Sequence, residues 1–212
     1  MRNRAIALGF LLLASTTSAF ADDSTVPYLG GSLGVNQDNM RLRDPTYVYT
    51  NFWATGLTGS IFGGFAWSND QFYVAGEGFG TELTARSSTK TINTGSGTTS
   101  AILRMRYSYG GSILPGLKIK TADDMVVYIR LGAVKTRFEL HQTVVPSGST
   151  SNISKTTASG GQIGIGVQGY VARAIALRGE YDYSGYRTYT AFNNKITPHD
   201  NQLSIGLIYQ FC

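Results

Sequence analysis

The chain has 212 residues and a net charge of +5, with 15% of its residues charged and 12% aromatic. Ordinary soluble domains carry roughly 25% charged residues, and a disordered chain carries more charge and fewer aromatic side chains, so disorder is excluded. A single cysteine excludes an internal disulfide and a cysteine-based zinc site.

The N-terminus has the three regions of a secretory signal peptide, which we predict over residues 1–21. Arg2 and Arg4 supply the positive charge, residues 5–14 are apolar, and Ala19-Phe20-Ala21 matches a cleavage site. The apolar segment is too short to cross a bilayer as a helix, which takes about 20 residues. The alternative is a buried N-terminal helix. The mature chain is therefore predicted to be 22–212 and exported.

Eight segments of the mature chain are predicted to be β-strands, because apolar residues alternate along them with polar or small ones. In chain order they are 28–36, 57–67, 71–81, 104–114, 125–134, 162–171, 177–184 and 202–211. In the last segment, Leu203, Ile205 and Leu207 share one face, opposite Gln202 and Ser204. Most of these segments have the length that a tilted strand needs to cross a membrane, about 9–11 residues. No apolar run reaches the length of a membrane-spanning helix, about 18 residues or more.

Short and long connections alternate between these segments. The short ones fall near 68–70, 120–124 and 172–174, and the long polar ones over 37–54, 83–100, 140–159 and 185–200. Outer-membrane barrels have short periplasmic turns and longer extracellular loops. The pattern therefore predicts an all-β protein, an eight-stranded antiparallel transmembrane β-barrel with up-and-down topology.

A secreted β-sandwich and a soluble lipocalin-like barrel would also show alternation, with the apolar face turned inward. Their outward face would carry many Lys and Glu residues, whereas here it carries mainly Gly, Ser, Gln and Ala. Aromatic side chains also gather at the ends of the apolar faces, as expected for a girdle at membrane interfaces. The predicted girdle is Trp67, Tyr107, Tyr109, Tyr181, Tyr183, Tyr209 and Phe211.

Three segments resemble the small eight-stranded outer-membrane barrels known as opacity-protein-like surface antigens. They are Pro27-Tyr28-Leu29-Gly30-Gly31-Ser32-Leu33-Gly34, Gly63-Gly64-Phe65-Ala66-Trp67 and Arg178-Gly179-Glu180-Tyr181-Asp182-Tyr183. The resemblance spans about 27–212 and implies a place in the Gram-negative outer membrane. It also implies folding by the barrel-assembly machinery, with Tyr209 and Phe211 as the assembly signal. In the family the signal aromatic is normally last, whereas here Cys212 follows it.

Several charged residues fall on the face predicted to line the barrel interior. They are Glu77, Arg104, Arg106, Arg130, Arg178, Glu180 and Asp182. A buried charge needs a partner, and Arg suits paired carboxylates through its two-pronged guanidinium group. We therefore predict an ion-pair network inside the barrel. It acts either as a structural plug, since eight-stranded interiors are filled by side chains, or as a gated path for small solutes.

No catalytic, cofactor-binding or metal-binding group is predicted. The two histidines, His141 and His199, lie at loop ends, and Asp200 would point to the opposite side of the strand from His199. A hydrolase or acyl transferase needs a nucleophile, a base and an acid in register. Two histidines are also too few for a convincing metal site. The protein is therefore expected not to be an enzyme and to need no cofactor.

The long connections mix aromatic and cationic residues, which suits contact with a protein or glycan surface. The residues predicted to make such contacts are Tyr47, Tyr49, Phe52, Trp53, Arg86, Lys90, Arg187 and Lys195. The expected function is a surface-exposed structural or adhesin-like protein; the alternatives are a narrow porin-like channel and a lipid-modifying enzyme. The expected partners are outer-membrane lipid, lipopolysaccharide and a host-surface ligand, and no nucleic acid.

Overall fold

The computed structural model describes residues 25–43, 49–87, 90–94, 97–119, 125–145, 150–191 and 194–211. The predicted signal peptide, Tyr47 and Cys212 lie outside these residues. Within the described ranges, no helix is long and apolar enough to cross a membrane.

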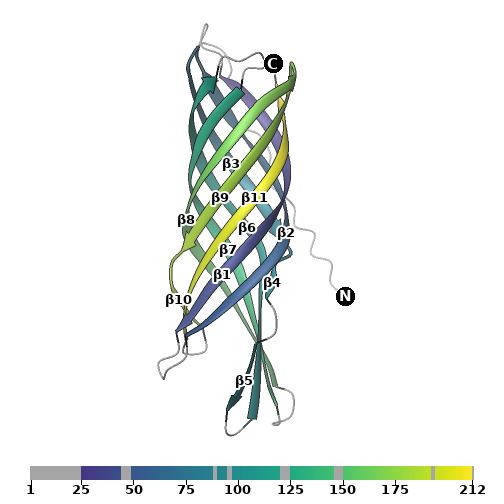
Figure 1. Cartoon of the computed structure of the whole chain (residues 1–212), viewed down its shortest axis with the longest axis vertical. Coiled ribbons are helices and arrows are strands. Elements are labelled where there is room, and N and C mark those ends of the chain that lie inside the picture. The colour runs from purple at the N-terminus through teal and green to yellow at the C-terminus, as the bar shows by residue number, and fades with distance from the viewer. Residues whose placement is uncertain are drawn as a thin grey trace.

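Eight long strands of the described chain close into an antiparallel barrel (Figure 1). They are β1 (Val26–Arg43), β2 (Tyr49–Ser68), β3 (Phe72–Leu83), β6 (Gly97–Ile119), β7 (Met125–Val145), β8 (Thr150–Ala172), β9 (Ile175–Tyr186) and β11 (Asn194–Gln210). Three short strands, β4 (Arg86–Ser87), β5 (Lys90–Thr94) and β10 (Tyr189–Ala191), extend them. Each long strand pairs with its neighbours along the chain, and β1 pairs with both β2 and β11. The predicted fold class is confirmed.

The outward-facing residues form an apolar band around the half of the barrel nearer the C-terminus. On β11, Leu203, Ile205, Leu207 and Tyr209 are 52–65% exposed, while the residues between them are buried. Similar runs lie on six of the seven other long strands: 29–35 on β1, 57–65 on β2, 109–119 on β6, 125–133 on β7, 163–171 on β8 and 175–183 on β9. Their lengths match the hydrocarbon thickness that a tilted strand crosses.

The strands continue well beyond this band, so the extent of the predicted long loops is corrected. β1 runs to Arg43 and β2 starts at Tyr49, and β7 runs to Val145 before β8 starts at Thr150. Beyond the band neither face has to be apolar, so alternation stops while the backbone pairing continues. Thr and Val in these segments favour extended structure through their branched Cβ atoms.

On one side of the barrel, the paired strands extend further from the apolar band than they do on the other side. β8 pairs with β9 only as far as Gly160↔Tyr186, whereas β7 and β8 stay paired to Val144↔Thr150. β6 likewise pairs with β7 up to Thr98↔Val145, and β5 pairs with residues 97–101 of β6. These parts of β5, β6, β7 and β8 form an open four-stranded extension, which we call the arm, at the end of the molecule opposite the C-terminus (Figure 1).

Candidate functional site

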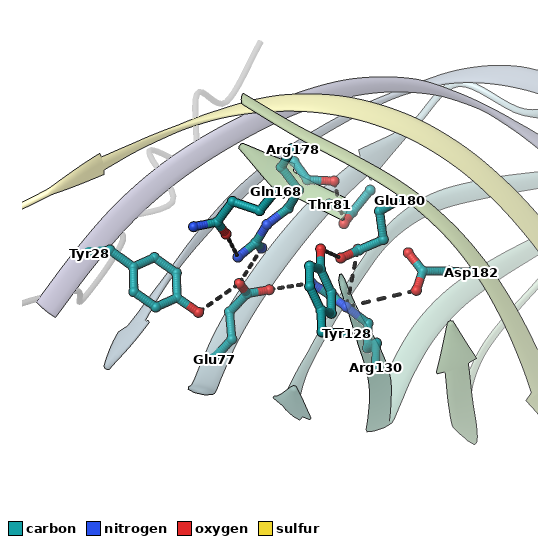
Figure 2. A network of polar contacts seen from close by, with 10 residues as sticks. Tyr28, Glu77, Thr81, Tyr128, Arg130, Gln168, Arg178, Glu180 and Asp182 are labelled. Atoms are coloured by element: carbon teal, nitrogen blue, oxygen red, sulfur yellow. Dashed lines mark hydrogen bonds and ion pairs between the residues drawn. The ribbon is translucent and has the colours of Figure 1, made fainter. Parts of the chain in front are cut away.

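A network of charged side chains crosses the barrel interior (Figure 2). On β7 and β9 its residues alternate with outward residues of the apolar band. Glu77 on β3 receives Arg130 Nη2 on one carboxylate oxygen and Arg178 Nη1 on the other, the latter at 2.6 Å. All three side chains are at most 5% exposed. They reach the same point because each lies on the inward face of its strand, where every second residue points into the barrel.

Two further acids extend the network along β9. Arg130 Nε lies 3.1 Å from Glu180 Oε1 and 3.7 Å from Asp182 Oδ1. Glycines on β8 make room for this arrangement, since a Cβ atom at Gly164 would clash with the carboxylate of Asp182. The network thus joins three acids with two arginines, all in the described interior.

Tyrosine hydroxyls bind the carboxylates on the side facing the chain termini. Tyr28 donates to Glu77 Oε2 at 3.0 Å and Tyr128 donates to Glu180 Oε2 at 2.6 Å. The guanidinium of Arg178 lies 5.4 Å from the Tyr128 ring centre and 4.6 Å from that of Phe62. The planar guanidinium of an Arg can stack on aromatic rings while its separate N–H groups bind different partners, as Arg130 does with Glu77 and Glu180.

A small polar cavity of about 30 Å³ lies beside the network. Its lining includes Ser32, Thr81, Gln162, Ser184 and Gln202. Apolar and aromatic side chains fill the barrel at both ends of it. At the end near the termini these are Tyr73, Leu114, Val126, Tyr128 and Ile208; at the far end they are Leu83, Met105, Phe138, Tyr186 and Ile196. Among the described residues, the charged layer is thus enclosed between two packed layers.

A closed antiparallel barrel with a charged interior and an apolar outer band is the architecture of bacterial outer-membrane proteins. A family model described as outer membrane protein beta-barrel domain matches residues 6–211. The chain belongs to this family. Its place is accordingly the bacterial outer membrane, as predicted. The end with the short turns faces the periplasm and the arm points outward from the cell.

Solved outer-membrane barrels share the fold. OmpT, an outer membrane protease of Escherichia coli, is 9% identical with a TM-score of 0.56 over 90% of this chain and 99% of that chain. Neisserial surface protein A is 18% identical, with a TM-score of 0.44 over 87% of this chain and 97% of that chain. The attachment invasion locus protein Ail of Yersinia pestis is 14% identical, with a TM-score of 0.42 over 87% and 98%. No curated protein matches the sequence.

Of the predicted interior charges, the barrel brings together Glu77, Arg130, Arg178, Glu180 and Asp182, but not the two arginines of β6. A β-bulge between Met105 and Ser108 leaves Arg106 and Tyr107 both exposed and turns Met105 inward. Arg104 and Arg106 therefore lie on the outer side of the wall, and their assignment to the lumen is wrong. Strict alternation fails at a bulge because one extra residue inverts the face of everything beyond it.

A second acidic pair, which the sequence analysis missed, lies inside the barrel just beyond the apolar band. Asp38 on β1 and Asp200 on β11 are directly opposite each other and are 0% and 5% exposed. Asn36 Nδ2 donates to Asp38 Oδ2 at 3.2 Å. Burial, and for Asp38 also the charge of its neighbour, raises the pKa of both carboxyls above the ordinary value. Continuing the inward face of 28–36 by one step would have found Asp38.

This pair predicts a pH-dependent stability. Because the pKa of each carboxyl is raised in the folded state, the folded barrel binds more protons than the unfolded chain, and stability falls as pH rises above about 4. Asp38→Asn removes one of the two ionisable carboxyls of the pair. It should stabilise the barrel at neutral pH by about 1–3 kcal/mol. Urea unfolding between about pH 4 and pH 8 measures this; Asp70→Asn, in an exposed turn, is the control. A parallel pH profile for Asp38→Asn and wild type would contradict the prediction.

The predicted girdle residues lie at the two edges of the apolar band. Tyr107, Tyr109, Tyr181 and Tyr183 are 40–49% exposed toward the extracellular edge, and Tyr209 and Phe211 are 52% and 50% exposed at the periplasmic edge, where Trp67 is half-buried. The proposed assembly-signal pair packs edge to face, with 5.1 Å between the ring centres of Tyr209 and Phe211. The Phe211 amide donates to the Pro27 carbonyl at 3.0 Å, which ties this end to β1.

Most predicted loop-contact residues belong to strand extensions rather than to loops. Tyr49, Phe52 and Trp53 lie in β2, Arg86 in β4, Lys90 in β5 and Lys195 in β11. Arg187 follows β9 and is exposed, and Trp53 is 53% exposed. The residues are thus spread around the extracellular half of the barrel wall instead of forming one loop cluster.

The two histidines lie on different strands of the described barrel wall, His141 on β7 and His199 on β11. His199 Nδ1 is 2.8 Å from the Tyr183 hydroxyl and its ring stacks on that tyrosine on the outer surface, while Asp200 points inward. His141 Nε2 lies 3.8 Å from Glu139.

Proposed function

We propose that this barrel is a closed surface protein that presents its extracellular strands, above all the arm, to a partner outside the cell. The observation that carries the proposal is the arm itself. It extends four strands beyond the point at which β8 leaves β9, without enlarging the barrel that the membrane requires.

The packed interior supports a surface-binding role rather than the transport of small solutes. A conducting barrel needs a continuous polar path, and eight-stranded barrels have room only for packed side chains. Here the buried network and the two packed layers occupy the described interior. A planar-bilayer recording is expected to give no discrete openings; a stable unitary conductance would favour the narrow channel instead.

The open edges of the arm suit contact with another surface. Among the residues that the structure describes, 150–158 of β8 pair with β7 alone and β5 pairs with β6 alone. An edge strand exposes backbone N–H and C=O groups that can pair with a partner strand, and Ser, Thr and Asn side chains can bind glycans. The proposal therefore includes a protein or glycan ligand and no catalysis.

Shortening the arm tests this function. Residues 88–102 and 141–153 would each be replaced by an Asn-Gly turn, which suits two-residue hairpins. Cells expressing this variant should lose most of their binding to cultured epithelial cells and to an array of sulfated and sialylated glycans. As a matched control, residues 190–195 of the β10–β11 hairpin would be replaced by the same turn. Equal binding by all three proteins would contradict the adhesive role.

A further inference from the structure

Five cationic side chains gather on the outer face of β6, β7 and β8, directly beyond the apolar band. They are Arg104, Arg106, Lys135, Arg137 and Lys155. We call this surface the basic face. Lys135 is two residues beyond Ala133, the last outward residue of the band on β7, and Arg137 is two further along. At about 3.3 Å per residue, the cations lie between roughly 7 Å (Lys135) and roughly 26 Å (Lys155) beyond the band along their own strands.

A single acid organises the basic face from beneath. Glu139 alternates with the inward-facing Phe138 and so points outward, yet it is 7% exposed because cations cover it. Its Oε2 accepts from Arg106 Nε at 3.1 Å and its Oε1 lies 3.9 Å from Lys155 Nζ. Burial raises the pKa of Glu139, but the hydrogen bond and charge of Arg106 outweigh it and hold the pKa below its ordinary value. Glu139 is thus a fixed anion that positions two cations.

Four of the five cations keep exposed surface for a ligand. Arg106 and Lys155 are 56% and 53% exposed despite their contact with Glu139, and Lys135 is exposed. Arg137 Nη1 donates to the Tyr107 hydroxyl at 3.2 Å, and its guanidinium lies 5.9 Å from that ring. On the described parts of β6, β7 and β8, one acid stands among five cations, which leaves the basic face with an excess of positive charge.

On other strands of the barrel, the outward residues just beyond the apolar band are not cations. Outward residues just beyond the band are Gln37 on β1, Thr55 on β2, Glu82 on β3 and Asn201 on β11, which are neutral or acidic. On β1, β2, β3 and β11 the first outward residue beyond the band is therefore not a cation, unlike Lys135 on β7.

We propose that the basic face binds the phosphate groups of lipopolysaccharide in the outer leaflet of the membrane. Those phosphates lie at the boundary between acyl chains and solvent, the height at which these cations stand. Arg pairs with phosphate through two parallel hydrogen bonds, and Lys supplies a point charge. Below the cations, Tyr109, Ile113, Leu131 and Ile163 face the acyl chains. One site thus offers charge for the headgroup and apolar surface for the lipid tails.

The test removes cations without exposing the buried acid. Arg106 is kept, because losing it would leave Glu139 buried without its hydrogen-bonded partner. Lys135→Gln, Arg137→Gln and Lys155→Gln are combined, and Lys118→Gln with Arg173→Gln, toward the periplasmic rim, forms the control. The folded proteins in neutral detergent micelles are titrated with phosphorylated lipopolysaccharide, and binding is followed by thermophoresis. Parallel titrations use dephosphorylated lipopolysaccharide and inorganic phosphate.

The triple variant is expected to bind lipopolysaccharide about 10–100-fold more weakly than wild type, with the control unchanged. Removal of the lipid phosphates should weaken wild-type binding by a similar factor, and inorganic phosphate alone should bind far more weakly than the lipid. Faster gel migration of the unboiled protein verifies folding. Should the triple variant not fold, Lys135→Gln with Lys155→Gln serves in its place. Unchanged affinity in the variant, or equal affinity for the dephosphorylated lipid, would overturn the proposal.

Discussion

Glu77→Gln is expected to destabilise the barrel by about 3–5 kcal/mol, the cost of breaking a buried ion pair by removing one partner. Glu77 is the carboxylate bound by both Arg130 and Arg178. Arg130 retains Glu180 and Asp182, but Arg178 has no other carboxylate within ion-pair distance in the described interior. Its guanidinium would then keep Gln168 and the surrounding rings, which cannot neutralise it. Reversible urea unfolding in lipid vesicles measures the loss.

Two further variants distinguish the effect of breaking the buried ion pair from the general effect of replacing a carboxylate by an amide. Glu82→Gln changes an exposed residue of the same strand and should shift stability by less than about 0.5 kcal/mol. Adding Arg178→Gln to Glu77→Gln removes the stranded cation, so the double variant should be more stable than the additive expectation. A loss below about 1 kcal/mol in Glu77→Gln alone would contradict a structural role for the network.

The sequence predicts the membrane-embedded half of this barrel well because the membrane imposes a strict rule there. Each outward residue must tolerate lipid, so Ile205 and Leu207 alternate with Ser204 and Gly206, and the period of two is visible. The same rule turns Arg130 and Arg178 inward, since a charge on the lipid side is costly. Beyond the membrane neither face is constrained in this way. The strands therefore continue past Val35 and Ala133 without a sequence signal that marks them.

The sequence predicts which side chains point into the barrel better than it predicts which of them contact each other. Tyr128 and Glu180 are 52 residues apart, and nothing in either segment indicates that the hydroxyl reaches the carboxylate. The bulge before Ser108 was also hidden, because Met105 and Tyr107 look equally suited to the outer face. Glu139 is separated from Arg106 by 33 residues, and the cluster on the outer wall exists only through this irregular register.

The second large expected effect is a loss of stability when a charged residue replaces a lipid-facing residue in the middle of the apolar band. Ile205 is 65% exposed near the middle of the apolar band, beside Leu33 on β1 and Gly179 on β9. Ile205→Arg should destabilise the barrel in lipid vesicles by about 2–4 kcal/mol, the cost of an arginine on the lipid face near the bilayer midplane.

Gln37→Arg is the matched control, because residue 37 also points outward but stands beyond the band, opposite Asn201. Its expected cost is about 0–1 kcal/mol, the value near the membrane interface. The difference between the two variants therefore measures where the membrane ends on this side of the wall. Equal losses in both would mean that residue 37 is also embedded, and Lys135, which likewise stands two residues beyond the band, would then lie within the hydrocarbon layer. A large loss for Ile205→Arg alone fixes the hydrocarbon boundary between these positions and leaves the cations of β6, β7 and β8 at the level of the lipid phosphates.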